Sequence, residues 1–331
     1  MSAAIQSSSG SVEQETPIVG AIEAGGTKTV CAVGRGPGAG ILARMQFATG
    51  DDPARTLAEA IDWLRAQERS LAAAGSLGAP AALASIGVAS FGPLDLDERS
   101  PAYGHVTTTP KPGWRDADVV GPLRRAFPGR PIGFDTDVNG AALGEHRWGA
   151  ACGLEDFVYV TVGTGIGGGG MARGRLLHGL VHPEMGHIPM PPVTGDSFAG
   201  ACPFHGRCWE GLCSGPAIAR RAGRPAEDLA LGDPAWDVTM RHMGNALATV
   251  TLMLSPRRIV LGGSVRRAGR LGEAAFLAGV REHLRAALAG YVGSPALEPP
   301  GLDGFLVPPE LGDDAGVCGA IALAQDAAGR R

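Results

Sequence analysis

Residues 157–170 read FVYVTVGTGIGGGG, and this stretch decides the fold of the chain. Its first half is apolar and β-branched, which is typical of a buried central strand. The second half is glycine apart from Thr164 and Ile166. Glycines let a backbone turn with positive φ and approach a ligand closely, and bare N–H groups suit a phosphate. We therefore predict a strand that leads into a phosphate-binding turn; a tight glycine turn without a ligand is the alternative.

The chain has 331 residues, enough for two domains with full cores, and a formal net charge of −4. That charge argues against nucleic acid or acidic lipid as a partner, and no apolar run is long enough to span a bilayer. Residues 1–17 lack the features of a signal peptide, so we expect a disordered tail. Six cysteines, three of them within residues 202–213, indicate a metal site and a reducing cytoplasm.

Strands and helices alternate along the chain, which predicts an α/β fold. Strands are expected near residues 18–24, 29–33, 45–49, 86–90, 131–134 and 258–261, and helices near residues 53–74, 116–126, 137–148, 237–254, 273–288 and 315–327, with another from residue 215. The loop at residues 94–114 is long enough to cover a site. A strand followed by glycines occurs in both halves of the chain, which predicts two related halves.

Two familiar phosphate motifs do not fit. Residues 20–29 almost match the P-loop, but Gly26 stands where the lysine should follow the second glycine. Residues 163–168 satisfy GxGxxG after a strand, but more glycines follow where a dinucleotide site needs a helix. A lone GxGxxG is a weak signal for a nicotinamide cofactor.

Two facing hairpins that hold the phosphates of a nucleotide with backbone N–H groups fit better. The predicted nucleotide-binding residues are Gly25, Gly26, Thr27 and Lys28 in the first hairpin, Gly163, Thr164, Gly165 and Gly167 in the second, and Gly262 and Gly263 beside the adenosine. Glu23, at the end of the first strand, is a candidate for holding Mg²⁺ through water; a half-exposed carboxylate without a metal is the alternative.

The sequence Asp135-Thr136-Asp137-Val138-Asn139 places two carboxylates where a strand meets a helix. Either carboxylate can cap the helix, but both cannot occupy the same cap position. A carboxylate that faces a hydroxyl here can accept its proton while phosphate is transferred. We favour Asp137 as this general base, supported by Asn139.

Residues 182–213 are dense in metal ligands. Cys202, His205 and Cys208 follow a C-x2-H-x2-C pattern that matches the preferences of Zn²⁺. His187 is the best fourth ligand, with His182 and Cys213 in reserve. Four protein ligands make a closed, structural site.

Two glutamates lie close in sequence to proposed ligands. Glu184 precedes His187 by three residues, and Glu210 follows Cys208 by two. A metal would fix their backbones, so that both can present carboxylates to sugar hydroxyls. Solvent-exposed acids with no such role are the alternative.

These pieces together resemble the ROK family of sugar kinases, and within it the bacterial fructokinase branch. The matching segments are IEAGGTK (22–28), GPLDLD (92–97), YGHVTTTPKPGW (103–114), DTDVNGAALGE (135–145), VTVGTGIGGG (160–169), HPEMGH (182–187), CPFHGRCWEGLCSGPAI (202–218) and LGGSV (261–265). They keep the family's order and extend over nearly the whole chain after residue 17.

The resemblance implies an actin/hexokinase-like (ribonuclease H-like) fold of two domains, 18–135 and 136–312, with a cleft between them and a zinc-bound insertion at 182–213. Residues 313–331 are then a C-terminal helix that packs back on the first domain. Asp137 would deprotonate the primary hydroxyl of the sugar. Thr136, Asn139, Glu184, His187 and Glu210 would contact the sugar, and His187, Cys202, His205 and Cys208 would bind structural zinc.

The resemblance also implies ATP with Mg²⁺, a hexose substrate and a homodimer. Thr136 and Glu23 depart from the usual glucokinase residues, asparagine and aspartate, and this departure favours fructose, phosphorylated to fructose 6-phosphate. Mannose, glucose and N-acetylated amino sugars are alternative substrates. The family also contains transcriptional repressors, but residues 1–17 are too few for a helix-turn-helix domain. A sugar-sensing protein without activity is the remaining alternative.

Overall fold

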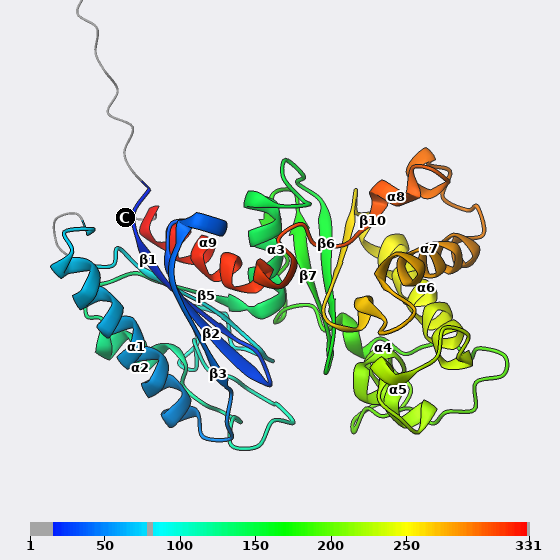
Figure 1. The fold of residues 1–331 in the computed structure, drawn as a ribbon, viewed down its shortest axis with the longest axis horizontal. Helices are drawn as coiled ribbons and strands as arrows, with labels where there is room; N and C mark the ends of the chain where they lie inside the picture. The colour runs from blue at the N-terminus through cyan, green and yellow to red at the C-terminus, as the bar shows by residue number, and fades with distance from the viewer. Residues whose placement is uncertain (1–15, 78–81, 330–331) are drawn as a thin grey trace, which may run out of the picture.

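The computed structural model describes residues 16–77 and 82–329, which include two five-stranded mixed sheets (Figure 1). Their strand orders are β3-β2-β1-β4-β5 and β10-β9-β6-β7-β8. In each sheet the first strand of the chain pairs antiparallel with the second and parallel with the fourth. This shared topology confirms the prediction of two related halves. The strands are β1 (Val19–Ala24), β2 (Lys28–Gly34), β3 (Ile41–Ala48), β4 (Ile86–Ser90), β5 (Ile132–Thr136), β6 (Phe157–Val162), β7 (Ile166–Ala172), β8 (Arg175–Leu176), β9 (Ile259–Gly262) and β10 (Leu306–Val307).

The helices form an outer layer on each sheet and a shared layer between the sheets (Figure 1). Helices α1 and α2 share a core with the first sheet, and α4 to α8 share one with the second. A third core joins α3 and α9 to residues of both sheets, including Val19 and Phe157. The helices are α1 (Pro53–Ala73), α2 (Val120–Ala126), α3 (Asp137–Trp148), α4 (Trp209–Cys213), α5 (Gly215–Ala222), α6 (Pro234–Leu254), α7 (Glu273–Leu288), α8 (Leu302–Phe305) and α9 (Ala315–Gly329).

The starts of two helices differ from the sequence prediction for local reasons. Helix α6 begins at Pro234, before residue 237, because the Asp233 side chain caps it by accepting the Ala235 N–H at 3.0 Å. Helix α2 begins at Val120, after residue 116, because Asp116 has a φ of 58° that no helix tolerates.

Strand bounds also shift by a few residues. Strand β3 starts at Ile41 rather than residue 45, and its alternating exposure is that of a sheet-edge strand. Strand β5 continues to Thr136, beyond the predicted end at residue 134. Most of the predicted tail, residues 1–15, lies outside the described residues. None of the helices in the described ranges has the length and apolar character that crossing a membrane requires.

The largest difference concerns the glycines after residue 165. The sequence predicts a turn there, whereas residues 166–172 form strand β7, antiparallel to β6. Glycines are depleted in strands, so their presence needs a packing reason. A Cβ at Gly168 would lie 2.5 Å from the Met185 sulfur, and one at Gly169 would lie 2.3 Å from the Asn139 Oδ1. Glycine therefore lets neighbours approach β7 on both faces.

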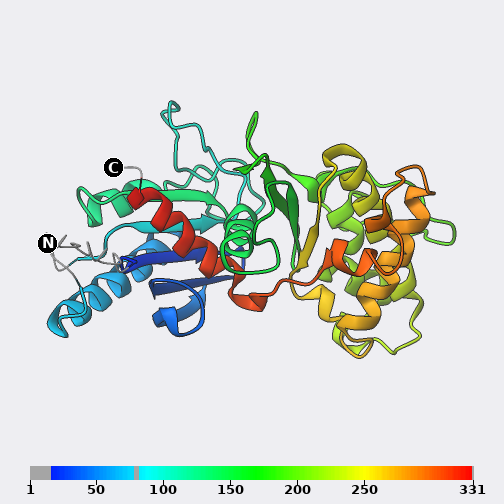
Figure 2. The same ribbon diagram turned by 90° about the horizontal axis from the view of Figure 1, so that it is seen from above.

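Helices α3 and α9 also pack closely against each other; α9, red in Figure 2, lies on the first sheet, and α3 contacts both sheets. A Cβ at Gly319 would lie 1.8 Å from the Gly140 carbonyl oxygen, and one at Gly144 would lie 2.7 Å from the Ala315 carbonyl oxygen. The two backbones are thus in contact where they cross. This contact joins the helix that begins at Asp137 to the end of the chain.

We predict that Gly319→Ala lowers the free energy of unfolding by about 3 kcal/mol, because the added methyl group forces apart two helices that the surrounding sheets hold in place. Urea unfolding measures the change. Gly304→Ala is the control, since a Cβ at Gly304 meets nothing within 4 Å. Equal stability of the two variants would show that the helices can separate without cost.

Candidate active site

The predicted site residues gather where the parallel strands of both sheets end. Strands β1, β4 and β5 run parallel, so Gly25, Phe91 and Asp137 follow them at one edge of the first sheet. Gly163 and Gly263 follow the parallel strands β6 and β9 of the second sheet in the same way. In Figure 1 the tips of the β1–β2 and β6–β7 hairpins both lie at the lower side of the molecule. Ligands of α/β sheets bind at such edges.

The first hairpin tip presents backbone to solvent. The Gly25 N–H donates to the Lys28 carbonyl at 2.9 Å and closes the turn, while Gly26, Thr27 and Lys28 are exposed. The Thr49 N–H donates to the Thr27 carbonyl at 3.0 Å, and this bond braces the tip from the side. The tip therefore offers N–H groups on a supported loop.

The second tip contains Gly163, Thr164 and Gly165. The Gly163 N–H donates to the Gly165 carbonyl at 2.9 Å, and Thr164 is exposed between them. The Glu210 Oε2 accepts the Ile166 N–H at 2.9 Å, and a Cβ at Gly165 would lie 2.7 Å from that oxygen. Glu210, predicted to contact a sugar, thus braces this tip with one of its oxygens.

Three other predicted nucleotide-binding glycines have visible packing roles. Gly167 lies inside β7, where a Cβ would come within 2.9 Å of Val138. Gly262 makes room for the Tyr159 hydroxyl, which a Cβ would approach to 2.2 Å. Gly263 has a φ of 85° and lies against the Val162 backbone. Their nucleotide role stays a prediction.

Asp137 is the first residue of α3 and is only partly exposed. The Thr136 hydroxyl caps this helix by accepting the Asn139 N–H at 3.1 Å, so neither aspartate is needed as the cap. Burial, then repulsion from the Glu23 carboxylate and more weakly from Glu184, raises the pKa of Asp137 from 3.8 to about 7. A carboxyl with this pKa can exchange a proton with a hydroxyl near neutral pH.

Asp135 and Asn139 hold the start of α3 in place. The Asp135 Oδ1 accepts the Asn139 side-chain N–H at 2.9 Å, and its Oδ2 lies 2.8 Å from the His178 Nε2. Asn139 also donates to the Leu177 carbonyl at 3.3 Å and accepts the Gly170 N–H at 3.2 Å. Asn139 is fully buried, and both of its side-chain N–H groups are engaged within the protein. Asn139 thus braces the start of α3; its support of a general base and its sugar contact stay predictions.

His178 was not identified from the sequence. It lies in the loop after β8, and its hydrogen bond to Asp135 raises its pKa. No motif marks His178, because the loop that carries it reaches Asp135 only in the folded chain.

Glu184 lies near Asp137 on the segment between β8 and the Cys/His cluster. The Glu184 side chain is 38% exposed, and the burial of the remainder, followed by the charge of Glu210, raises its pKa to about 7. His182, 3.6 Å from Glu184, accepts the Leu94 N–H of the first half with its Nε2 at 3.0 Å. Burial lowers the pKa of His182, which keeps the ring neutral for that role.

Glu23 is the second acid whose charge acts on Asp137. Its Oε2 is buried without a hydrogen-bond partner, and burial raises its pKa against the opposing charges of Lys28 and Arg44. A buried carboxylate oxygen without a partner is costly, and it fits a residue whose partner is a ligand or a hydrated cation.

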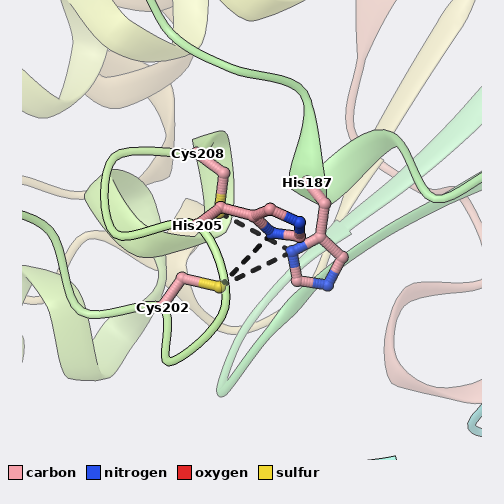
Figure 3. Close-up of side chains that lie close together, drawn as sticks. All are labelled: His187, Cys202, His205 and Cys208. Carbon is pink, nitrogen blue, oxygen red and sulfur yellow. Dashed lines mark hydrogen bonds between the residues drawn. The ribbon is translucent and has the colours of Figure 1, made fainter. Parts of the chain in front are cut away.

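His187, Cys202, His205 and Cys208 come together as predicted. One ligand atom from each lies within 4.8 Å of all the others, and Figure 3 shows the four side chains pointing toward a common centre. The Cys202 Sγ is 3.7 Å from His187 Nδ1 and 3.8 Å from His205 Nδ1. The Cys208 Sγ is 3.6 Å from His187 Nδ1. A tetrahedral metal bound by sulfur and nitrogen separates its ligands by about 3.6 Å, so this cluster can hold a metal.

His182 and Cys213, the two alternative metal ligands, do not lie in this cluster. His182 binds the Leu94 N–H, and the Cys213 thiol is buried and donates to the Thr239 carbonyl at 3.8 Å. Both were therefore wrong as alternatives to His187. Spacing alone did not separate the candidates, because each is close enough in sequence to reach a loop site.

The loop at residues 94–114 is fastened beside the first hairpin tip. Lys111 donates to the Thr49 carbonyl at 2.9 Å, and the buried Trp114 donates to the Gly50 carbonyl at 2.8 Å. Thr49 also binds the Thr27 carbonyl, so the loop and the tip share one support.

Known proteins resemble this chain over nearly its whole length. A sequence model of the ROK family matches residues 19–327. The fructokinase of Zymomonas mobilis is 40% identical over 316 residues, 95% of this chain and 98% of that protein.

Two solved structures share the fold. The ROK hexokinase from Thermus thermophilus has a TM-score of 0.71 at 28% identity, over 93% of this chain and 97% of that one. A ROK family glucokinase from Streptomyces griseus, in complex with glucose and AMPPNP, has a TM-score of 0.68 at 26% identity, over 93% and 99%. These likenesses confirm the predicted actin/hexokinase-like fold.

We predict that Asp137→Asn stabilises the protein at alkaline pH. The raised pKa means that the folded state keeps a proton that the unfolded chain loses near pH 3.8. This contribution to wild-type stability is therefore full below that pH and is lost as the pH rises to about 7. The variant should gain free energy of unfolding over the wild type at pH 8, and the gain should shrink by pH 5.5.

Urea unfolding at the two pH values measures the difference. Asp62→Asn makes the same change of charge on the exposed side of α1 and is the control. An equal effect of Asp137→Asn at both pH values would contradict the raised pKa.

Proposed function

The chain belongs to the ROK family, and from that premise we propose an ATP-dependent fructokinase that converts D-fructose to fructose 6-phosphate. The observation that carries the proposal is Asp137, an acid of raised pKa at the start of α3, where the ends of both sheets meet. Fructokinases 36–40% identical over most of the chain support fructose as the substrate.

Asp137 acts as the general base in this proposal. Its carboxylate accepts the proton of the sugar 6-hydroxyl while the hydroxyl oxygen bonds to the γ-phosphorus and the bond to the ADP oxygen breaks. Glu184 and Glu210, with His187, are proposed to bind other sugar hydroxyls, and Thr136 and Asn139 are proposed to contact the sugar from the start of α3. Repulsion from Glu23 and Glu184 keeps Asp137 basic enough for this role near neutral pH.

The two hairpin tips are proposed to hold ATP. Exposed N–H groups at residues 26–27 and 164–165 can donate to phosphate oxygens, as in other glycine-rich phosphate sites. Lys28 adds a positive charge, and Gly262 and Gly263 border the adenosine. Mg²⁺ bound with ATP neutralises phosphate charge, and Glu23, with its unpartnered buried oxygen, would hold it through water.

The Cys/His cluster is proposed to bind structural zinc. Two sulfur and two nitrogen donors suit Zn²⁺, and four protein ligands leave no open position for catalysis. The ion would fix residues 182–213, which include both proposed sugar-binding glutamates.

The remaining proposals concern assembly and compartment. Residues 18–135 and 136–312 are proposed as the domains that close on the substrates, with residues 313–331 packed against the first. All six cysteines are free thiols, which supports a reducing cytoplasm. Leu252 and Met253, exposed by 53% and 74%, offer apolar surface that a homodimer would cover.

The first test is ADP release by the purified protein with Mg-ATP and a panel of hexoses. We expect turnover with fructose well above that with mannose, glucose or N-acetylated amino sugars. A different preferred sugar would keep the mechanism and change the substrate. Absence of turnover with every sugar would contradict the proposal and favour a sugar-sensing protein.

The same assay with Asp137→Asn tests the base. Loss of a general base typically costs about 100-fold or more in kcat, while the sugar KM should change little because the amide keeps the shape of the side chain. A kcat within about threefold of wild type would assign the base to another residue.

We predict that Cys208→Ser loses the zinc. Elemental analysis should find about one zinc per wild-type chain and little in the variant, together with a lower thermal midpoint. Serine can replace Cys208 as the cap that accepts the Gly211 N–H, so loss of the cap does not explain the result. Cys152→Ser, at an exposed cysteine outside the cluster, is the control. Full zinc content in Cys208→Ser would contradict the ligand assignment.

A further inference from the structure

The chain passes between the two sheets twice, and both passages lie beside one end of α3. The first crossing, residues 149–156, leads from α3 to β6. The second crossing, residues 308–314, leads from β10 back to α9, and it is the red-orange segment that joins the two halves in Figure 2. The two crossings, together with the junction of β5 and α3, are the places where the chain can bend when one sheet moves relative to the other.

One side chain binds both crossings. Glu145, in the last turn of α3, is fully buried. Its Oε2 accepts the Ala150 N–H of the first crossing at 2.6 Å and the Glu310 N–H of the second at 3.1 Å. Its Oε1 accepts the Leu311 N–H of the second crossing at 2.9 Å. A single carboxylate therefore joins two chain segments that are distant in sequence, through one N–H group of the first crossing and two adjacent N–H groups of the second.

The residues around Glu145 leave room for its carboxylate and donate hydrogen bonds to it. A Cβ at Gly149 would lie 2.2 Å from the Glu145 Oε2, so glycine leaves room for the bond to Ala150. Burial raises the pKa of Glu145, while the N–H groups of Ala150, Leu311 and Glu310 lower it. A buried acid at the C-terminal end of a helix is otherwise unfavourable, because the helix dipole is negative there. Neighbouring N–H donors, rather than a cation, offset this cost.

The helix that carries Glu145 begins at Asp137. The two residues are eight positions apart, which is about 12 Å along a helix. Because α3 is a rigid element in contact with both sheets, its position relative to the second half depends on how its far end is fixed to the crossings.

We infer that Glu145 is a positioning residue for phosphate transfer: it fixes both crossings to α3, so that the halves pivot at this point and Asp137 meets the hairpin tip at residues 163–165 in a reproducible place. This inference rests on the proposed kinase function for its effect on turnover. The fixing of the two crossings themselves does not depend on that function.

The test is Glu145→Gln, which keeps the size of the side chain. In either orientation its amide N–H group faces a backbone donor, so at least one of the three bonds is lost. Hydrogen–deuterium exchange should accelerate about tenfold or more in both crossings, at residues 149–156 and 308–314. Turnover at temperatures well below the thermal midpoint should fall about tenfold, mainly through kcat, because a small displacement of the reacting groups is costly.

Two further variants complete the experiment. Glu155→Gln makes the same change of charge on an exposed residue of the first crossing and should leave exchange and kcat unchanged. Glu145→Asp keeps the charge but withdraws it by one methylene group, and it should accelerate exchange in at least one crossing. It also keeps the test valid if Glu145→Gln does not fold.

Three results would overturn the inference: unchanged exchange in both crossings, faster exchange with an unchanged kcat, or the same changes in Glu155→Gln. A purely structural role would lower the thermal midpoint without lowering kcat at lower temperature. If the wild type phosphorylates no sugar, the proposed function fails, whereas the exchange measurement still decides whether Glu145 fixes the crossings.

Discussion

The site depends on the absence of side chains along β7. Gly167 and Gly169 let α3 approach one face of the strand, where Cβ atoms would come within 2.9 Å of Val138 and 2.3 Å of the Asn139 Oδ1. Gly168 leaves room for Met185 on the opposite face. Asp137 is the first residue of α3, and Glu184 comes directly before Met185. Asp137 and Glu184 can therefore lie close together because the glycines of β7 have no side chains. Glycine carries an entropic cost on folding.

Close packing at glycines also joins segments that are far apart in the chain. Where α3 and α9 cross at Gly140 and Gly319, helix backbones meet without side chains between them. Helix α3, which contacts both sheets, is thereby held against the last helix of the chain, and Glu145 fastens the far end of α3 to both crossings. Close contact at one end of a helix and a shared carboxylate at the other restrict how the halves can move. Such restriction is what a reaction that depends on positioning requires.

The sequence was sufficient for features that local chemistry determines. Strand-forming runs, the helix that starts at Asp137 and the C-x2-H-x2-C pattern around His205 were predicted, and the predicted metal ligands come together in the structure. Strand β7 was missed because its glycines indicate a turn by local preference, and only packing against α3 and Met185 explains them. His178 and the anchoring role of Glu145 were missed for a related reason: their partners lie on other segments, so no spacing rule marks them.

The metal cluster and the hairpin tip are parts of one arrangement. Glu210 follows Cys208 by two residues and accepts the Ile166 N–H beside the second tip, so fixing Cys208 also fixes a support of that tip. On the other side of the cluster, the Glu184 carbonyl accepts the His187 N–H at 3.0 Å, so a metal bound by the four side chains would also limit the movement of Glu184. The charges of Glu184 and Glu210 repel, and this repulsion adds to the effect of burial in raising the pKa of Glu184. Free loops would relieve that repulsion by moving apart, whereas a metal bound at the cluster, as proposed, would keep the two glutamates close to each other. The proposed closed metal site would therefore matter to the chemistry without touching a substrate, because it would hold together carboxylates that repel one another.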